Sequence, residues 1–208
     1  LNRDSLALHH EVVPFDAAEA WKKLIDTGAD FEAFDALEGI YRSEERWTDV
    51  IDVKMMRAEA LTEPSEKIEE FRSVAVIWTD TLNEADSATT AYQKILGVDG
   101  ASDEAFFELE KRHQTASRWE QLIELYLARL ETRSETTERT DLLRKIARVF
   151  EEHLEDKNQA FDALLTALNE DFHDRETARY LERMAQATGR WGELIQNVNQ
   201  WLKAEKDS

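Results

Sequence analysis

The chain has 208 residues, no cysteine, and a formal net charge of −19 from 26 basic and 45 acidic side chains. So acidic a surface repels phosphate, which argues against general nucleic-acid binding, and the lack of cysteine excludes disulfides and thiolate zinc sites. Six glycines and two prolines are too few for the turns of an all-β fold, so the composition indicates an all-α protein.

Residues 1–29 are expected to form an incomplete leading hairpin, in which a helix remnant up to residue 13 precedes a helix that Asp16 caps and Gly28 ends. From there on, apolar residues recur at helical spacing in segments separated by polar breaks. The pattern predicts helical hairpins over residues 30–63, 64–101, 102–135, 136–173 and 174–208. Because the chain opens inside a repeat, we interpret residues 1–208 as a single excerpt of a longer array.

Helix-start signals support these boundaries. Asp30, Ser102 and Asp174 occupy one phase of the pattern, and side chains of these types accept hydrogen bonds from free amides at a helix N-terminus. Ser117 and Glu120 have the spacing of a capping box around Trp119.

An Arg-Trp pair recurs at a constant interval, since 119 − 47 = 72 and 191 − 119 = 72. The same shift superposes Glu38, Glu110 and Glu182, and then Ile51, Ile123 and Ile195. A fixed internal period indicates a repeat architecture. Because each tryptophan is followed by isoleucine four positions later, we predict that Trp47 and Trp119 fill the apolar seam between hairpins.

The segment from Asp156 to Leu168 resembles the second helix of a tetratricopeptide repeat (TPR), as does the segment from Gly189 to Leu202. In the preceding first helix, the residues at positions where that family places Trp, Leu, Gly and Tyr are Leu143, Ile146, Ala147 and Phe150. The resemblance implies a right-handed α-solenoid of antiparallel helical hairpins whose first helices line a concave groove. The related half-a-TPR repeats of RNA-processing scaffolds are an alternative.

Motifs for catalysis or metal binding are lacking. The five histidines are His9, His10, His113, His153 and His173, and no two of them have the i, i+4 spacing of a helical zinc site. Since His113 stands where the family has its tyrosine, a packed histidine is expected there. We therefore expect no enzyme, no metal and no cofactor. Without a membrane-length apolar run or a recognisable signal peptide, we expect a soluble protein and favour the cytoplasm over the periplasm.

Basic residues recur on the outward positions of the predicted first helices, which the resemblance places on the concave face. They are Arg72, Lys111, Arg144, Arg148, Arg179 and Arg183, with Phe107 and Tyr180 beside them. Arginine binds carboxylates in bidentate geometry, so this set is a candidate clamp for acidic side chains or a C-terminal carboxylate. The alternative is that these cations pair with nearby glutamates such as Glu110 or Glu182.

The sequence thus predicts a non-enzymatic scaffold that binds a protein or peptide segment in its groove, with no nucleic-acid partner and no membrane insertion. An architectural spacer that self-associates through its terminal hairpins is the second interpretation.

Overall fold

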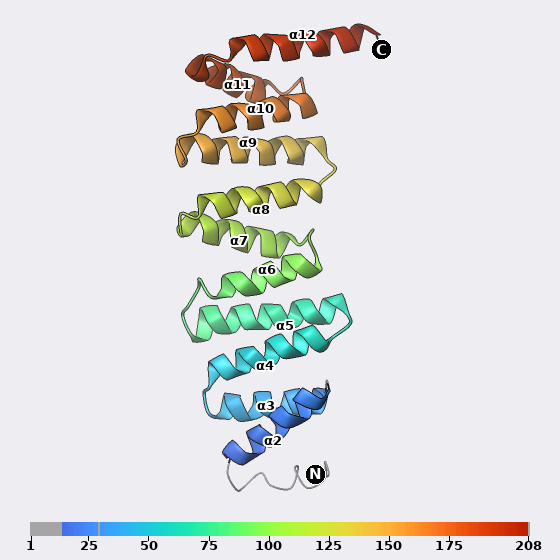
Figure 1. The fold of residues 1–208 in the computed structure, drawn as a ribbon, viewed down its shortest axis with the longest axis vertical. Coiled ribbons are helices and arrows are strands. Elements are labelled where there is room, and N and C mark those ends of the chain that lie inside the picture. The colour runs from blue at the N-terminus through green and yellow to red at the C-terminus, as the bar shows by residue number, and fades with distance from the viewer. Residues whose placement is uncertain (1–13, 29, 208) are drawn as a thin grey trace. The chain divides into compact units, whose positions relative to one another are not determined.

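A computed structural model describes residues 14–28 and 30–207, and all its regular secondary structure there is helical. The predicted helix remnant before residue 13, with His9 and His10, lies outside the described residues. The chain divides into two compact units, residues 1–108 and 109–208. Within each unit, successive helices run back and forth and pack on their sequence neighbours (Figure 1). The predicted all-α fold of antiparallel helical hairpins is confirmed.

The first unit contains the helices up to the middle of α7. They are α2 (Pro14–Thr27), α3 (Phe31–Ser43), α4 (Trp47–Ala60), α5 (Pro64–Val76), the π-helical turn η1 (Ile77–Thr81), α6 (Ala88–Val98) and the start of α7 (Asp103–Thr115). The turn η1 directly extends α5, so the two form one continuous helix from Pro64 to Thr81. α2 begins at Pro14, and Asp16 is therefore not its cap as predicted. Proline suits this first position because its missing N–H has no helical partner there.

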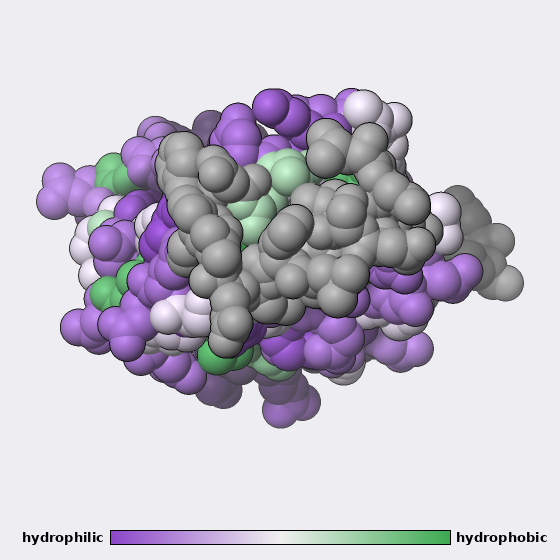
Figure 2. Space-filling view, turned by 90° about the horizontal axis from the view of Figure 1, so that it is seen from below, coloured by the Kyte–Doolittle hydropathy of each residue, from purple (hydrophilic) through white to green (hydrophobic). Residues whose placement is uncertain are grey.

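The second unit continues the same alternation. Its helices are the end of α7, then α8 (Trp119–Glu131), α9 (Thr136–Glu152), α10 (Lys157–Glu170), α11 (Arg175–Thr188) and α12 (Trp191–Asp207). Among the described residues, no helix is long and apolar enough to cross a membrane. Hydrophilic side chains dominate the surface seen in Figure 2, as expected for so charged a chain.

Fully buried alanines lie within the hairpins formed by α5 and α6 and by α9 and α10. Ala75 on α5 and Ala88 on α6 have no exposed surface, and neither do Ala147 on α9 and Ala160 on α10, one interval of 72 residues later. A small side chain lets two helix backbones approach closely, so the surrounding leucines and phenylalanines can pack without voids. The sequence period therefore corresponds to a repeated packing arrangement.

Left-handed backbone conformations recur with the same period. The described residues with positive φ are Glu45 (56°), Ser117 (54°) and Gly189 (75°), each two positions before a tryptophan, and Asn83 (55°) and Glu155 (53°) in the alternate hairpins. Each follows a helix and reverses the chain direction. Glycine adopts this conformation without a steric cost and asparagine does so readily, so the turns at Glu45, Ser117 and Glu155 hold a strained residue in place.

A backbone hydrogen bond across each turn explains how the strain is held. The amide of the residue after the left-handed one donates to a carbonyl five residues earlier: Arg46 to Tyr41 (2.9 Å), Arg118 to His113 (2.8 Å) and Arg190 to Ala185 (3.1 Å). In the alternate hairpins, Asp156 donates in the same way to Phe150 at a separation of six (2.8 Å). Such bonds satisfy carbonyls that a helix end leaves unpaired.

This turn corrects the predicted capping box. Ser117 is the left-handed residue, and Arg118 is the N-cap of α8 without a side-chain cap bond. The other predicted caps are confirmed: Asp30 accepts from the amide of Glu32, Asp174 from that of Glu176, and the Ser102 hydroxyl from that of Ala105. Sequence spacing alone does not show whether a residue such as Ser117 belongs to the turn or is the N-cap of the next helix.

Trp47 and Trp119 lie only at the edge of the seam that they were predicted to fill. Each is the first residue of its helix and is only half-buried. The seam is filled instead by Ile51 and Ile123, one helical turn further in, and both are buried. A side chain at the first turn of a helix lies at the edge of the hairpin, where the apolar core ends.

Two substitutions at the left-handed turn residues should change the free energy of unfolding in opposite directions. We expect Ser117→Gly to raise the free energy of unfolding by about 0.5–1 kcal/mol, because glycine removes the steric cost of the left-handed conformation. Gly189→Ala should lower it by about 1 kcal/mol for the same reason. Urea denaturation followed by circular dichroism measures both. Equal signs for the two variants would contradict the assignment of these turns.

Candidate functional site

Every residue of the candidate clamp lies on a first helix of a hairpin. Arg72 is on α5 and Phe107 on α7 in the first unit. The second unit holds the remaining six, which are Lys111 on α7, Arg144 and Arg148 on α9, and Arg179, Tyr180 and Arg183 on α11. Only the second set therefore lies within one unit.

Arg72 and Arg144 are occupied by intramolecular ion pairs. Arg72 on α5 donates to Glu104 on α7 at 2.6 and 2.8 Å and also pairs with Glu69. Arg144, one period later, pairs with Asp141 and with Asp174, the N-cap of α11. Since both guanidiniums bridge successive first helices, they fasten neighbouring hairpins together and are poorly available to a ligand.

Arg183 makes an ion pair with Glu151 but leaves part of its guanidinium exposed. Its Nη2 donates to Glu151 Oε2 on α9 at 2.9 Å, and the Tyr180 hydroxyl donates to the same oxygen at 2.7 Å. Burial opposes ionisation of Glu151, but these two donors hold its pKa below the ordinary value. The guanidinium also lies over the Tyr180 ring, 4.6 Å from its centroid, and more than half of the Arg183 side chain remains exposed. One face of this cation is therefore open to solvent.

Lys111, Arg148 and Arg179 are exposed and make no ion pair with any residue that the structure describes. Phe107 is also exposed, with its ring packed edge-on against Phe106 at a centroid distance of 5.4 Å. The basic residues thus fall into two groups. Arg72 and Arg144 form internal ion pairs, as the alternative interpretation predicted, whereas Arg148 and Arg179 have free charges.

A pocket of about 440 Å³ opens beside Arg148 in the second unit. It is lined by residues of two first helices and of the second helix between them, namely Glu110 and Gln114 of α7, Trp119, Leu122 and Tyr126 of α8, and Lys145, Arg148, Val149 and His153 of α9. Leucine, valine and aromatic rings form its apolar part, and two cations lie at its α9 side. This size and mixture suit one or two side chains of a bound segment.

A buried carboxylate organises the polar part of this pocket. Glu110 accepts a hydrogen bond from the Tyr126 hydroxyl and another from Lys145 Nζ, both at 2.7 Å. Burial and the adjacent carboxylate raise the pKa of Tyr126, so its hydroxyl stays protonated and keeps donating. Because Lys145 is paired with Glu110, Arg148 is the cation of this pocket that is available to an anionic ligand.

Stacked aromatic rings form one wall. The Trp119 ring lies parallel to the His153 ring, with centroids 3.6 Å apart and an interplanar angle of 4°. His153 follows α9 as its C-cap, while Trp119 opens α8, so two helix ends meet here. The half-buried tryptophan therefore lines the pocket. The sequence prediction, which placed this ring in the core, missed this position.

The periodic glutamates were the sequence signal for this arrangement. Glu38 occupies the equivalent position of the first unit and pairs with Lys54 Nζ at 3.2 Å. Lys54 stands one period before Tyr126, so a different donor reaches the same carboxylate position in each unit. Burial opposes ionisation of Glu38, yet Lys54 and Arg42 keep its pKa lowered. In both units, the carboxylate at this position is thus accommodated by a partner on the next helix.

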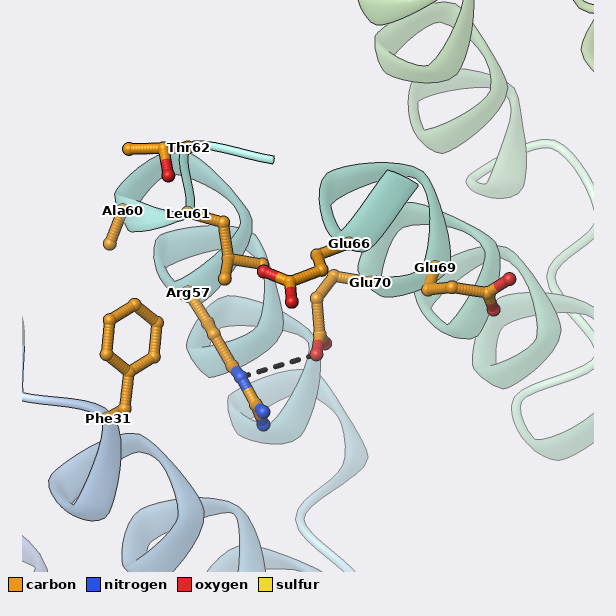
Figure 3. Close-up of a pocket in the computed structure, with 8 residues that line it drawn as sticks. All are labelled: Phe31, Arg57, Ala60, Leu61, Thr62, Glu66, Glu69 and Glu70. Atoms are coloured by element: carbon orange, nitrogen blue, oxygen red, sulfur yellow. Dashed lines mark ion pairs between the residues drawn. The ribbon is translucent and has the colours of Figure 1, made fainter. Parts of the chain in front are cut away.

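A second pocket, of about 590 Å³, lies in the first unit between α4 and α5 (Figure 3). Phe31, Leu61 and Ala60 form its apolar side, and Glu66, Glu69 and Glu70 its acidic side. Its single cation, Arg57, has Nε 3.3 Å from Glu70 and Nη1 2.9 Å from Asp35. With three carboxylates and one engaged guanidinium, this pocket repels acidic ligands.

Among the described residues, no group of three or more histidine, aspartate or glutamate side chains is arranged to hold a metal ion. No protein-family model matches the sequence, and neither does any curated protein. Among solved structures, the chain is similar to YrrB, a TPR protein described as having an unusual peptide-binding site. The two are 15% identical with a TM-score of 0.37, over 82% of this chain and 84% of that chain.

His113 supplies a pH-dependent prediction. It is buried on α7, and its Nδ1 makes no hydrogen bond among the described residues. Burial, with Arg118, lowers its pKa from 6.5. The unfolded chain therefore binds a proton more readily, so stability is full above pH about 6.5 and declines as the pH falls towards the folded value.

We expect His113→Tyr, which restores the residue type of the buried Tyr41 one period earlier, to reduce this decline between pH 7.5 and 5.5. Urea denaturation at several pH values measures it, and His173→Gln, at an exposed histidine, is the control. An identical decline in His113→Tyr and wild type would show that His113 does not titrate on unfolding.

Proposed function

We propose that this chain is a non-enzymatic scaffold that binds an acidic segment of a partner protein in the groove formed by α7, α8 and α9. The observation that carries the proposal is Arg148. It is an exposed guanidinium without an ion partner at the rim of a pocket with an aromatic wall. Arg183 and Tyr180, which contact α9 through Glu151, extend the basic surface beyond the pocket.

The ligand chemistry follows from what each group can bind. Arg148 offers several N–H donors in a planar fork that matches a carboxylate. The half-buried Trp119 ring offers apolar surface to a neighbouring side chain. A segment with an aspartate or glutamate next to an aliphatic or aromatic residue, or ending in such a residue with a free carboxylate, satisfies both.

The free-energy contributions of the ion pair and of the apolar contact can be compared. An exposed ion pair contributes only about 0.2–1 kcal/mol, whereas burying apolar surface contributes about 25 cal/mol per Å². Because Leu122 and Val149 are already buried, little apolar surface besides the Trp119 ring is left to cover. The apolar and ionic contributions are therefore of similar size, and the arginine selects the charge. The overall charge of −19 opposes acidic ligands at long range, but screening over about 8 Å at physiological salt leaves the local cations in control.

The test compares Arg148→Glu/Arg183→Glu with wild type in binding an array of synthetic peptides that pair acidic with aromatic residues. Wild type should select acidic over lysine-substituted peptides. The double variant should bind the selected peptide at least about tenfold more weakly, because an attractive charge becomes repulsive. Fluorescence anisotropy with labelled peptides gives the dissociation constants.

Lys203→Glu/Lys206→Glu, on the exposed end of α12, makes the same change in net charge and is the matched control. It should leave binding close to wild type. Undiminished binding by Arg148→Glu/Arg183→Glu, or an equal loss in the control, would refute a groove-specific carboxylate site.

A further inference from the structure

The pocket of about 590 Å³ between α4 and α5, called the acidic pocket below, contains an exposed aromatic ring. Phe31, the first residue of α3, is 41% exposed although its ring packs against Phe34 with centroids 6.0 Å apart. Figure 3 shows this ring on one side of the pocket and Glu66 and Glu70 on the other. Because α3, α4 and α5 each already pack on both of their sequence neighbours, the pocket is not a helix face left open for a further repeat.

The equivalent positions one period later show what the acidic pocket lacks. Leu61 corresponds to Arg133 and Glu66 to Glu138, since 133 − 61 = 72 and 138 − 66 = 72. In the second unit, Arg133 Nε lies 3.5 Å from Glu138 Oε2, so the chain itself supplies a cation to this glutamate. In the first unit, Glu66 is exposed and makes no ion pair with any residue that the structure describes. The carboxylate is therefore kept, whereas leucine replaces its arginine partner.

The other charges of the acidic pocket favour a cation at this place. Its own guanidinium, Arg57, is paired with Glu70 at 3.3 Å and with Asp35 at 2.9 Å, so its charge is neutralised within the chain. The Glu69 side chain, which is 70% exposed, adds negative charge on the same helix as Glu66. At longer range, the formal net charge of −19 attracts a basic partner.

The combination of an exposed ring and a free carboxylate suits a guanidinium better than an ammonium. A guanidinium is planar, so it can stack on an aromatic face while its N–H groups bind a carboxylate. The methylene groups of an arginine side chain can also cover apolar surface, which the half-buried Leu61 offers beside the ring.

We propose that the acidic pocket binds an arginine side chain of a partner protein, with the guanidinium at Glu66 and the side chain against Phe31 and Leu61. The partner thus supplies the group that Arg133 supplies in the second unit. The site belongs to the first unit and prefers a basic ligand, so it is distinct from the groove of α7, α8 and α9 and does not depend on acidic ligands binding there.

The probe is acetyl-arginine-amide, whose only charge is its guanidinium, added to the isotopically labelled 208-residue chain. Two-dimensional amide spectra should show saturable shifts at Phe31, Leu61, Thr62 and Glu66. Acetyl-lysine-amide should bind at least about twofold more weakly, because an ammonium does not stack on the ring. Acetyl-citrulline-amide, which has the same shape without the charge, should cause no saturable shift.

Two variants test the assigned contacts. Leu61→Arg supplies the arginine that the second unit has at this position, so it should fill the pocket and weaken binding at least tenfold. Glu66→Gln should weaken binding about two- to fivefold, the range expected for one exposed ion pair. Unchanged amide shifts elsewhere in the spectrum establish that each variant is folded.

Leu127→Arg is the matched control, since Leu127 is an exposed leucine on α8 in the second unit and the change in charge is the same. It should bind the probe like wild type. Wild-type binding by Leu61→Arg, an equal loss in Leu127→Arg, or the absence of saturable shifts would overturn the proposal. Equal shifts with the arginine and lysine probes at acidic residues throughout the chain would also overturn it, because net charge alone would then attract both.

Discussion

The left-handed turn that ends a helix is the constraint on which the repeated structure depends. Its cross-turn hydrogen bond fixes where the next helix begins, and the tryptophan helices start two residues after it each time. Once the start is fixed, Ile51 and Ile123 reach the seam without further adjustment. The turn tolerates glutamate, serine and glycine alike, so it is held by packing and hydrogen bonding on both sides rather than by one residue type.

Basic side chains have a particular role in so acidic a chain. Arg72 and Arg144 connect successive first helices through carboxylates, and Lys54 connects α4 with α5. Each of these pairs removes one positive and one negative charge from the set that remains free, so the net charge of −19 is carried by fewer charged groups. Against this background, the free guanidinium of Arg148 stands out electrostatically.

Helix positions were predictable because they depend on local signals. Asp30 and Asp174 cap their helices through their own side chains, and Ala75 and Ala147 mark close approach within a hairpin. The ion partners of Arg144 were not predictable, because they depend on how far a neighbouring hairpin is rotated. The half-exposure of Trp119 was also missed, since periodicity reports that a position is equivalent between repeats but not how deep it lies. The pocket combines three helices and has no signature in any one segment.

The extensive contacts in both units join helices that are neighbours in sequence, such as α5 with α6 and α9 with α10. Folding of this chain therefore closes only short loops, and the entropy lost before each contact forms is small. Helical hairpins can form early and independently, with adjacent ones then consolidating in either direction along the chain. Such a molecule unravels gradually rather than all at once, and its local opening is governed by the weakest junction between hairpins rather than by the global stability.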